Sequence, residues 1–181
     1  MERSRLVFSG SGGQGVITAA IILAKAAVIY EGKNAIQSQS YGAAARGGAT
    51  RSDVIISESD IFFPKVNQPN ILVTLTQEAY NKFSGIIRPG GLLLVDGKYV
   101  KPQKKVDAKH ISLPLYDTVM KEIGKPIVFN ICMLGALIGL SELLEPESII
   151  RVLETTIPED FMEMNKKALD LGLAMGTENR V

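Results

Sequence analysis

Tryptophan is absent from this 181-residue sequence, and cysteine and histidine each occur only once. Five tyrosines and six phenylalanines make up the whole aromatic content. A surface that stacks on nucleic-acid bases needs clustered aromatic and basic side chains, so these numbers argue against a nucleic-acid partner. The net charge of +1 agrees, because it leaves no excess of one sign to attract a polyanion or a membrane surface.

The scarcity of metal-binding side chains excludes further classes of site. Cys132 lies in the apolar run Ile131-Cys132-Met133-Leu134. A lone thiol can neither close an internal disulfide nor hold an iron–sulfur cluster, so we expect a small buried hydrophobic residue there. His110 has no neighbours at metal-ligand spacing, and we expect a surface or structural histidine. The sequence therefore predicts no metal site and no catalytic residue.

A signal-peptide pattern and an uncharged apolar run of about 18 residues are also lacking. We therefore expect a cytoplasmic protein with no membrane contact. The balance of 46% hydrophobic and 22% charged residues is typical of a globular protein with a substantial core. No repeat, low-complexity tract or linker interrupts the chain, so residues 1–181 are expected to form a single domain.

Apolar runs typical of strands alternate with helical patterns along the chain. We expect strands at 5–9, 34–40, 49–57, 70–75, 92–95 and 110–114, and helices at 14–31, 76–83, 115–123, 127–143, 146–156 and 160–175. Residues 34–64, with a short extended piece at 61–64, indicate antiparallel strands without an intervening helix. The predicted fold class is α/β: a layered Rossmann-like domain with a mainly parallel sheet, an additional small antiparallel sheet, and helices.

Two other stretches have a distinctive composition. The helix expected at 127–143 is apolar on nearly every face and carries Gly135 and Gly139, so it is predicted to be buried in its own core or against a partner. Residues 98–109 are rich in lysine, which is typical of a solvated loop or of an edge strand that lysines protect from pairing. A phosphate-binding role for these lysines is the alternative.

The strongest candidate for a binding site is the glycine-rich run from Ser9 to Val16. It lies between an apolar strand and a helical pattern, and only glycine lets the backbone turn so sharply and approach a ligand so closely. Such a turn delivers backbone N–H groups at a helix N-terminus, where the helix dipole favours an anion. A tight turn without a ligand is the alternative.

Gly10, Gly12 and Gly15 match the G-x-G-x-x-G pattern of dinucleotide-binding folds. That fold also wants an acidic residue at the end of the second strand, to hold the ribose hydroxyls. Here the second strand ends in Gln37-Ser38-Gln39-Ser40, and the nearest acid, Glu31, precedes the strand. A stand-alone dinucleotide-binding module therefore stays open as an alternative function.

A second glycine stretch, Tyr41 to Gly48, follows the strand expected at 34–40. Its Arg46 is flanked by small residues, so its planar guanidinium can reach a phosphate or carboxylate, or form an interface ion pair. Tyr41 can stack or donate a hydrogen bond. The candidate binding residues are Gly10, Ser11, Gly12, Gly13, Gln14, Gly15, Tyr41, Arg46, Gly47 and Gly48.

Together these motifs resemble the gamma subunit of the 2-oxoacid:ferredoxin oxidoreductases. The resemblance is carried by Gly10 to Val16, by Gln39-Ser40-Tyr41-Gly42 and by Arg46-Gly47-Gly48, and it extends over nearly the whole chain, through Asn130 and Asn165 to Leu169. Within the family the sequence is most similar to the gamma subunit of the 2-oxoglutarate enzymes. The pyruvate and branched-chain 2-oxoacid branches stay open.

The resemblance implies a subunit that is not active alone, in an enzyme that converts a 2-oxoacid, coenzyme A and oxidised ferredoxin to acyl-CoA, carbon dioxide and reduced ferredoxin. It implies that thiamine diphosphate, magnesium and the iron–sulfur clusters lie on partner subunits, named alpha, beta and in some enzymes delta. This chain would close the active-site cleft and contact coenzyme A through the glycine loop and Arg46. The isolated chain is expected to be able to form a homodimer, and a purely structural assembly role is a further alternative.

Overall fold

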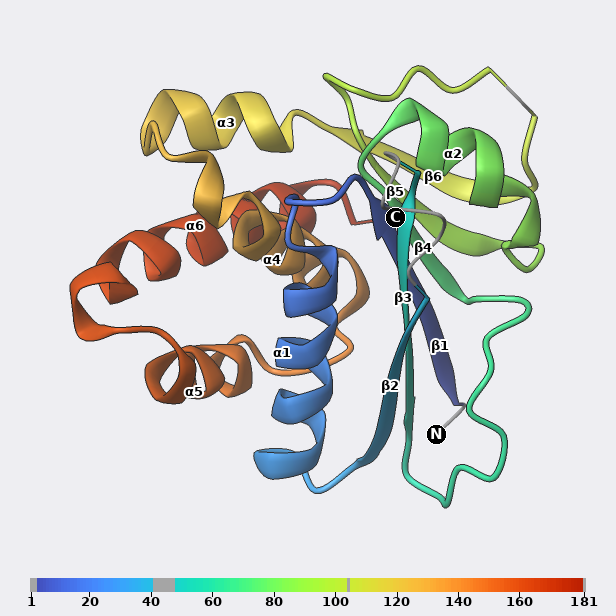
Figure 1. Ribbon diagram of the computed structural model, residues 1–181, viewed down its shortest axis with the longest axis horizontal. Coiled ribbons are helices and arrows are strands. Elements are labelled where there is room, and N and C mark those ends of the chain that lie inside the picture. Colours follow the sequence, from blue (N-terminus) through green and yellow to red (C-terminus); the bar gives the residue numbers. More distant parts are fainter. Residues whose placement is uncertain (1–2, 41–47, 104, 181) are drawn as a thin grey trace.

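A computed structural model describes residues 3–40, 48–103 and 105–180, which form an α/β fold around one sheet (Figure 1). Six strands make up this sheet in the spatial order β2-β3-β1-β4-β5-β6. The strands are β1 (Ser4–Gly10), β2 (Asn34–Ser40), β3 (Thr50–Ser57), β4 (Ile71–Thr74), β5 (Gly91–Asp96) and β6 (Ala108–Leu113). The α/β class predicted from the alternating pattern is therefore confirmed.

The sheet is mainly parallel, as expected. β1 pairs in parallel with β4, β4 with β5, and β5 with β6, whereas β3 is antiparallel to both of its neighbours, β1 and β2. The structure corrects one expectation, because β2 and β3 do not form an additional sheet. β3 pairs with β1 from Ser4 to Gly10, so the hairpin satisfies the backbone groups on the open side of β1 and extends the same sheet.

Helices cover both faces of the sheet (Figure 1). The helices are α1 (Val16–Ile29), α2 (Gln77–Phe83), α3 (Leu115–Glu122), α4 (Phe129–Ser141), α5 (Pro146–Thr156) and α6 (Glu159–Glu178), with short 3-10 turns η2 (Ser84–Ile86) and η3 (Pro126–Val128). The short extended piece expected at 61–64 is not part of a strand. In the described part of the chain, no helix combines the length and the apolar character that crossing a bilayer requires.

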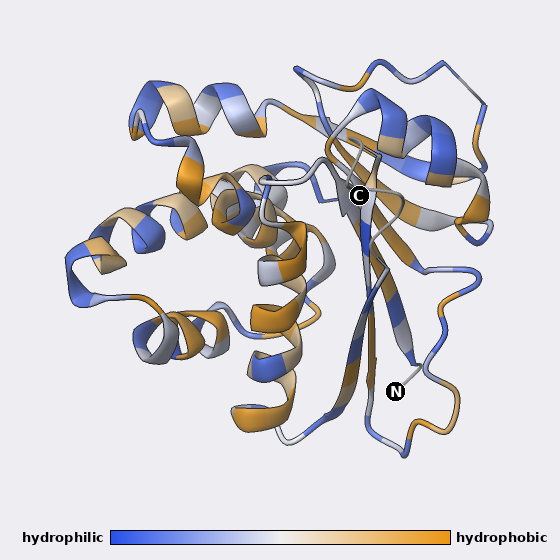
Figure 2. Cartoon of the chain, viewed as in Figure 1, coloured by the Kyte–Doolittle hydropathy of each residue, from blue (hydrophilic) through white to orange (hydrophobic). Residues whose placement is uncertain are grey.

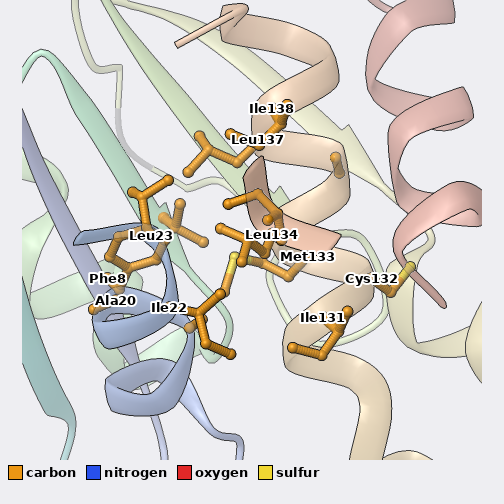
Figure 3. Packing of buried hydrophobic residues seen from close by; sticks show 14 of the residues in the cluster. Phe8, Ala20, Ile22, Leu23, Ile131, Cys132, Met133, Leu134, Leu137 and Ile138 are labelled. Atoms are coloured by element: carbon orange, nitrogen blue, oxygen red, sulfur yellow. The ribbon is translucent and has the colours of Figure 1, made fainter. Parts of the chain in front are cut away.

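The pleat of β1 divides the core into two clusters. Leu6 and Phe8 belong to the cluster that contains α1 and α4, whereas Val7 belongs to the cluster with Tyr80 and Phe83 of α2. Successive strand residues point to opposite faces, and all three of these β1 side chains are fully buried. Figure 3 shows Phe8 against Ala20, Ile22 and Leu23 of α1, with the side chains of α4 beside them.

Helix α4 is buried on every side, from Phe129 to Leu140, which confirms the prediction made from its composition. Its cover comes from this chain, because α4 lies between α1 and α6 (Figure 1). Glycines let α4 and α6 approach with their backbones in contact. A Cβ atom added at Gly135 would lie 2.2 Å from the Leu169 carbonyl oxygen, and one added at Gly172 would lie 1.9 Å from that of Cys132.

Candidate functional site

The carboxyl end of β1 lies at a switch point of the sheet, where the connections that follow two neighbouring strands pass to opposite faces. β1 continues into α1 on one face of the sheet, and its parallel neighbour β4 continues into α2 on the other face. The loops after two such strands diverge, and they leave a crevice at the edge of the sheet where ligands of α/β proteins commonly bind. The glycine loop, Gly10 to Gly15, lies at this position.

Two glycines of this loop have backbone angles that other residues rarely adopt. φ is +88° at Gly13 and +74° at Gly15, which is the N-cap residue of α1. No side chain caps the first turn of α1, so its backbone N–H groups have no intrahelical or capping partner. The predicted strand–turn–helix unit is present, and it begins the helix at Val16 rather than at Gln14.

Gln14 turns its side chain back over the loop. Its Oε1 accepts a hydrogen bond from the Ser11 N–H at 2.8 Å, and its Nε2 donates to the Leu75 carbonyl oxygen at 3.3 Å. Gly10 makes room for this side chain, because a Cβ there would lie 2.4 Å from Oε1. The N–H of Ser11 is thus already paired, and Gln14 ties the loop after β1 to the loop after β4.

Asn130, at the start of α4, holds the other end of the loop. Its Nδ2 donates to the Gly15 carbonyl oxygen at 3.2 Å, and the residue is buried. A Cβ atom on Gly15 would lie 2.6 Å from Nδ2, so only glycine fits against this amide. Gly10 and Gly15 are therefore explained by packing within the chain.

Gly12 is different from the other loop glycines. Its φ lies outside the left-handed region, no atom lies within 4 Å of an added Cβ, and the residue is exposed. Within the described part of the chain, the N–H groups of Gly12 and Gly13 have no hydrogen-bond partner. These two groups are the backbone donors that the loop can offer to an anionic ligand.

Two hollows flank the loop and share Gly13 and Gln14. The first, which we call the tyrosine crevice, has a volume of about 310 Å³ and is lined by Ser11, Gly13, Gln14, Thr76, Tyr99, Tyr116, Pro126 and Phe129. Its aromatic rings pack edge to face, with centroids 5.2 Å apart for Tyr99 and Tyr116 and 5.6 Å for Tyr116 and Phe129. The Lys98 Nζ lies 4.5 Å from the Tyr116 ring centroid, so a cation borders this wall.

Asp96, at the end of β5, fixes the position of both tyrosines. Its Oδ2 accepts from the Tyr116 N–H at 2.8 Å, and its Oδ1 accepts from the N–H groups of Lys98 at 2.8 Å and Tyr99 at 3.3 Å. Burial raises the pKa of this carboxyl above its ordinary value, and the three N–H groups oppose that rise by stabilising the carboxylate. Lys98 itself forms an ion pair with Asp117, which raises the pKa of its ammonium.

The second hollow, which we call the apolar groove, has a volume of about 370 Å³ and runs from the glycine loop between α1 and the ends of α4 and α6. Ile127 and Phe161 line it and are 76% and 50% exposed. Thr18, Asn130 and Asn165 add polar groups to its wall. The loop can therefore be approached from an aromatic side and from an aliphatic side.

The second glycine stretch lies mostly outside the described residues. Tyr41, Arg46 and Gly47 are among those not described, whereas Gly48 is half-buried. Gly48 precedes Thr50, which pairs with Gly10 of β1, and the Thr50 carbonyl oxygen accepts from the Ser9 hydroxyl at 2.8 Å. Gly48, the described end of this stretch, thus leads into the strand that pairs with β1, close to the start of the glycine loop.

Cys132 and His110 occupy the kinds of position expected for them. Burial raises the pKa of the Cys132 thiol to about 12, so the side chain stays protonated and packs as a hydrophobic residue. His110 is exposed on β6, and its ring stacks on that of Tyr80 with centroids 5.9 Å apart. Among the described residues, no cluster of three or more His, Cys, Asp or Glu side chains could hold a metal ion.

Residues 5–175 match the model of the pyruvate ferredoxin/flavodoxin oxidoreductase family. The chain belongs to this family. A 2-oxoglutarate synthase subunit, KorC, from Methanocaldococcus jannaschii is 43% identical over 178 residues, which are 97% of this chain and 95% of the relative. The family and the length of this relative therefore agree with the resemblance carried by the two glycine motifs.

Solved structures of oxidoreductases share the fold. The gamma subunit of a keto/oxoacid ferredoxin oxidoreductase from Geobacter sulfurreducens has a TM-score of 0.91 and 38% identity, and the match covers all of both chains. A 2-oxoglutarate:ferredoxin oxidoreductase from Magnetococcus marinus has a TM-score of 0.88 at 21% identity, and its match covers 98% of this chain but 32% of that one. That enzyme was solved with 2-oxoglutarate, coenzyme A and succinyl-CoA bound.

Four residues that line or support the candidate site are not among the predicted binding residues. Asn130 appeared only in the resemblance, and Asp96, Tyr99 and Tyr116 were not singled out as site residues. Asp96 ends a buried strand at the same sheet edge as the glycine loop, and this position could have marked it. The rings of Tyr99 and Tyr116 meet because the turn after β5 and the start of α3 lie side by side. No local sequence pattern predicts that contact.

Proposed function

We propose that this chain is the gamma subunit of a multi-subunit 2-oxoacid:ferredoxin oxidoreductase that acts on 2-oxoglutarate. The reaction converts 2-oxoglutarate, coenzyme A and oxidised ferredoxin to succinyl-CoA, carbon dioxide and reduced ferredoxin. The observation that carries this proposal is the 43% identity to a 2-oxoglutarate synthase subunit over almost the full length of both chains. Pyruvate synthase subunits match at lower identity, 32% over 169 residues for one of them, which supports the 2-oxoglutarate branch.

The partners in this proposal are the alpha and beta subunits, with a delta subunit in some enzymes of this kind. We propose that they hold thiamine diphosphate, magnesium and the iron–sulfur clusters, and that ferredoxin docks on the complex rather than on this chain. The single thiol of this chain is buried and protonated, which agrees with a subunit that takes no part in electron transfer. The chain would then serve the reaction through binding and through closure of the active-site cleft.

The specific task we assign to the chain is contact with coenzyme A. The unpaired N–H groups of Gly12 and Gly13 and the uncapped first turn of α1 suit a phosphate group. Arg46 lies in the sequence between β2 and β3, and we propose that it adds a cation. The apolar groove begins at the same loop, and its mostly apolar lining suits the aliphatic part of such a ligand.

The test of the complex is an affinity purification of this chain from its native cell extract. Coenzyme-A-dependent reduction of a viologen dye is then measured in the eluate with 2-oxoglutarate, with pyruvate and with branched 2-oxoacids. We expect larger subunits to co-purify and 2-oxoglutarate to give the highest kcat/KM. Activity only with pyruvate would move the chain to another branch, and recovery of the chain without partners or activity would contradict the proposal.

The test of coenzyme A contact uses Arg46→Ala in the assembled enzyme. Loss of one charged phosphate contact should raise the KM for coenzyme A about tenfold and leave the KM for 2-oxoglutarate unchanged. Arg151→Ala is the matched control, because Arg151 is exposed on α5 and lies over the Tyr30 ring, away from the glycine loop. An unchanged KM for coenzyme A would remove Arg46 from this role and leave the subunit assignment intact.

A further inference from the structure

Two asparagines in the wall of the apolar groove each have an oxygen atom without a hydrogen-bond partner. Asn130 and Asn165 are buried, with 7% and 6% of their surfaces exposed. Each amide uses its Nδ2 within the chain: Asn130 donates to the Gly15 carbonyl oxygen at 3.2 Å, and Asn165 donates to the Phe161 carbonyl oxygen at 2.9 Å. In the part of the chain that the structure describes, neither Oδ1 atom accepts a hydrogen bond. Buried polar atoms are nearly always paired, so both oxygens are available to a donor from outside the chain.

The two oxygens are open to the groove and not sealed in the core. Among the described residues, the side-chain oxygens that are both unpaired and fully buried are those of Thr74 and Ser84. Those of Asn130 and Asn165 do not belong to this group, and both residues line the groove. The internal bond of each Nδ2 also fixes the orientation of its amide. The groove therefore presents two acceptors that are already oriented before a ligand binds.

The remaining surface of the groove is mostly apolar and carries no charge among the described residues. Figure 2 shows the hydrophobic colour on most of α1, which forms one wall. At one end the groove meets the glycine loop at Gly13, whose N–H is unpaired within the described chain. A ligand that fits both parts has an anionic group for the loop, followed by an uncharged chain that combines apolar carbon atoms with N–H donors. The apolar residues of the lining are Ile22, Ile127, Val128, Ile131, Ile157, Pro158, Phe161 and Met164.

We propose that Asn130 and Asn165 accept hydrogen bonds from the amide N–H groups of the pantetheine arm of coenzyme A. This inference rests on the proposed function, in which the glycine loop binds a phosphate group of coenzyme A. The arm runs from a phosphate group to the thiol through an uncharged chain that contains two secondary amides, so it has all the groups that the loop and the groove require. A nucleotide without the arm leaves both oxygens unpaired, and a site built to pair with a donor discriminates against a ligand that lacks it. The groove thus selects coenzyme A over other adenosine nucleotides.

The test compares two constants of the assembled enzyme. One is the KM for coenzyme A, and the other is the inhibition constant of adenosine 3′,5′-bisphosphate, which has the nucleotide part of coenzyme A without the arm. Asn165 is the residue to change, because Asn130 also holds the glycine loop. In Asn165→Leu, which has a similar volume and no acceptor, the KM for coenzyme A should rise about fivefold. The inhibition constant of the bisphosphate should stay unchanged, because this molecule does not enter the groove.

Two further variants separate the lost acceptor from the lost internal bond. Asn179→Leu is the matched control, because Asn179 Nδ2 donates to the Met175 carbonyl oxygen at 2.9 Å, four positions earlier on the same helix, just as Asn165 does to Phe161. Asn179 lies outside the groove, so its variant should keep the wild-type KM. Asn165→Asp keeps an acceptor oxygen and loses the bond to Phe161, so its KM should stay close to that of the wild type.

The outcomes that overturn the inference are distinct from those that overturn the proposed function. An unchanged KM in Asn165→Leu would remove the groove from recognition of the arm. An equal rise in KM and in the inhibition constant would also contradict the inference, because it would indicate a disturbed loop. The same holds for a rise in Asn179→Leu or in Asn165→Asp that equals the rise in Asn165→Leu. In each case an effect of Arg46→Ala on the KM for coenzyme A would leave the proposed function intact.

Discussion

The glycine loop and the crossing of α4 over α6 both depend on glycine, yet they use it for different purposes. At the crossing, Gly135, Gly139, Gly172 and Gly176 remove side chains so that two backbones can touch. In the loop, Gly10 and Gly15 also make room for neighbours of the same chain, but Gly12 faces open space. A glycine therefore marks a candidate ligand site only where the packing of the chain does not itself require glycine.

The largest effect is expected at the helix crossing. Gly172→Ala would place a Cβ 1.9 Å from the Cys132 carbonyl oxygen, and no side-chain rotation can relieve a backbone contact. We expect the free energy of unfolding to fall by about 3 kcal/mol or more, measured by urea denaturation. Gly85→Ala is the control, since an added Cβ there meets nothing within 4 Å, and a comparable loss in both variants would refute this explanation.

Gly15→Ala should have an intermediate effect, because two costs combine there. Alanine is strained at a φ of +74°, and its Cβ would lie 2.6 Å from Asn130 Nδ2. We expect a loss of about 2 kcal/mol in the free energy of unfolding. In the double variant with Asn130→Ala the contacts with Nδ2 and Cγ are removed and only that with the Asn130 Cβ, at 2.9 Å, remains. The steric cost should therefore shrink, and the two losses should be less than additive. Full additivity would show that Asn130 does not constrain the loop.

Asp96, which holds the two tyrosines of the tyrosine crevice, should make the stability of the chain depend on pH. Its pKa is raised in the folded state, so between the ordinary value of 3.8 and that higher value the folded chain holds a proton that the unfolded chain has released. Stability from this group is therefore complete below pH 3.8 and is lost as the pH rises through the folded-state pKa, by about 1.4 kcal/mol per unit of elevation. Asp96→Asn should abolish this slope in urea denaturation at a series of pH values, and an identical slope in the variant would contradict the assignment.

The smallest change in stability is expected at Gly12. Gly12→Ala should alter the free energy of unfolding by less than about 0.5 kcal/mol, because the added methyl group meets no atom within 4 Å. In the assembled enzyme the same change should raise the KM for coenzyme A about tenfold, because the ligand would have to approach past the methyl group. A variant with both parameters unchanged would reduce the loop to a structural turn.

Much of the fold could be predicted because its local signals are strong. The predicted ranges 34–40 and 146–156 are the observed bounds of β2 and α5. Thr76 caps α2 as expected, accepting from the Ala79 N–H at 3.1 Å. Helix ends were less accurate: residues 127–143 were predicted as one helix, but α4 spans Phe129–Ser141 and η3 precedes it. The apolar pattern continues through η3, so periodicity alone could not separate the two elements.

The position of the candidate site could be predicted from the sequence, but the contacts between its residues could not. Strand, glycine turn and helix identify the end of β1, but the sequence does not reveal that Gln14 pairs with Ser11 and Leu75. The placement of Asn130 against Gly15 joins residues 115 positions apart, and only tertiary packing determines it. The joining of β2 and β3 to the main sheet likewise depends on the long-range pairing of β1 with β3.

The late position of α4 and α6 in the chain has a consequence for synthesis. Helix α4 completes the core that β1 and α1 begin, yet Phe129, its first residue, comes 119 residues after Gly10 in the sequence. On the ribosome, β1 and α1 therefore emerge well before the helix that buries the rest of their apolar surface. The nascent chain is exposed to aggregation during that interval, and loss of even one turn of α6, which packs on α4, should reduce the yield of soluble protein.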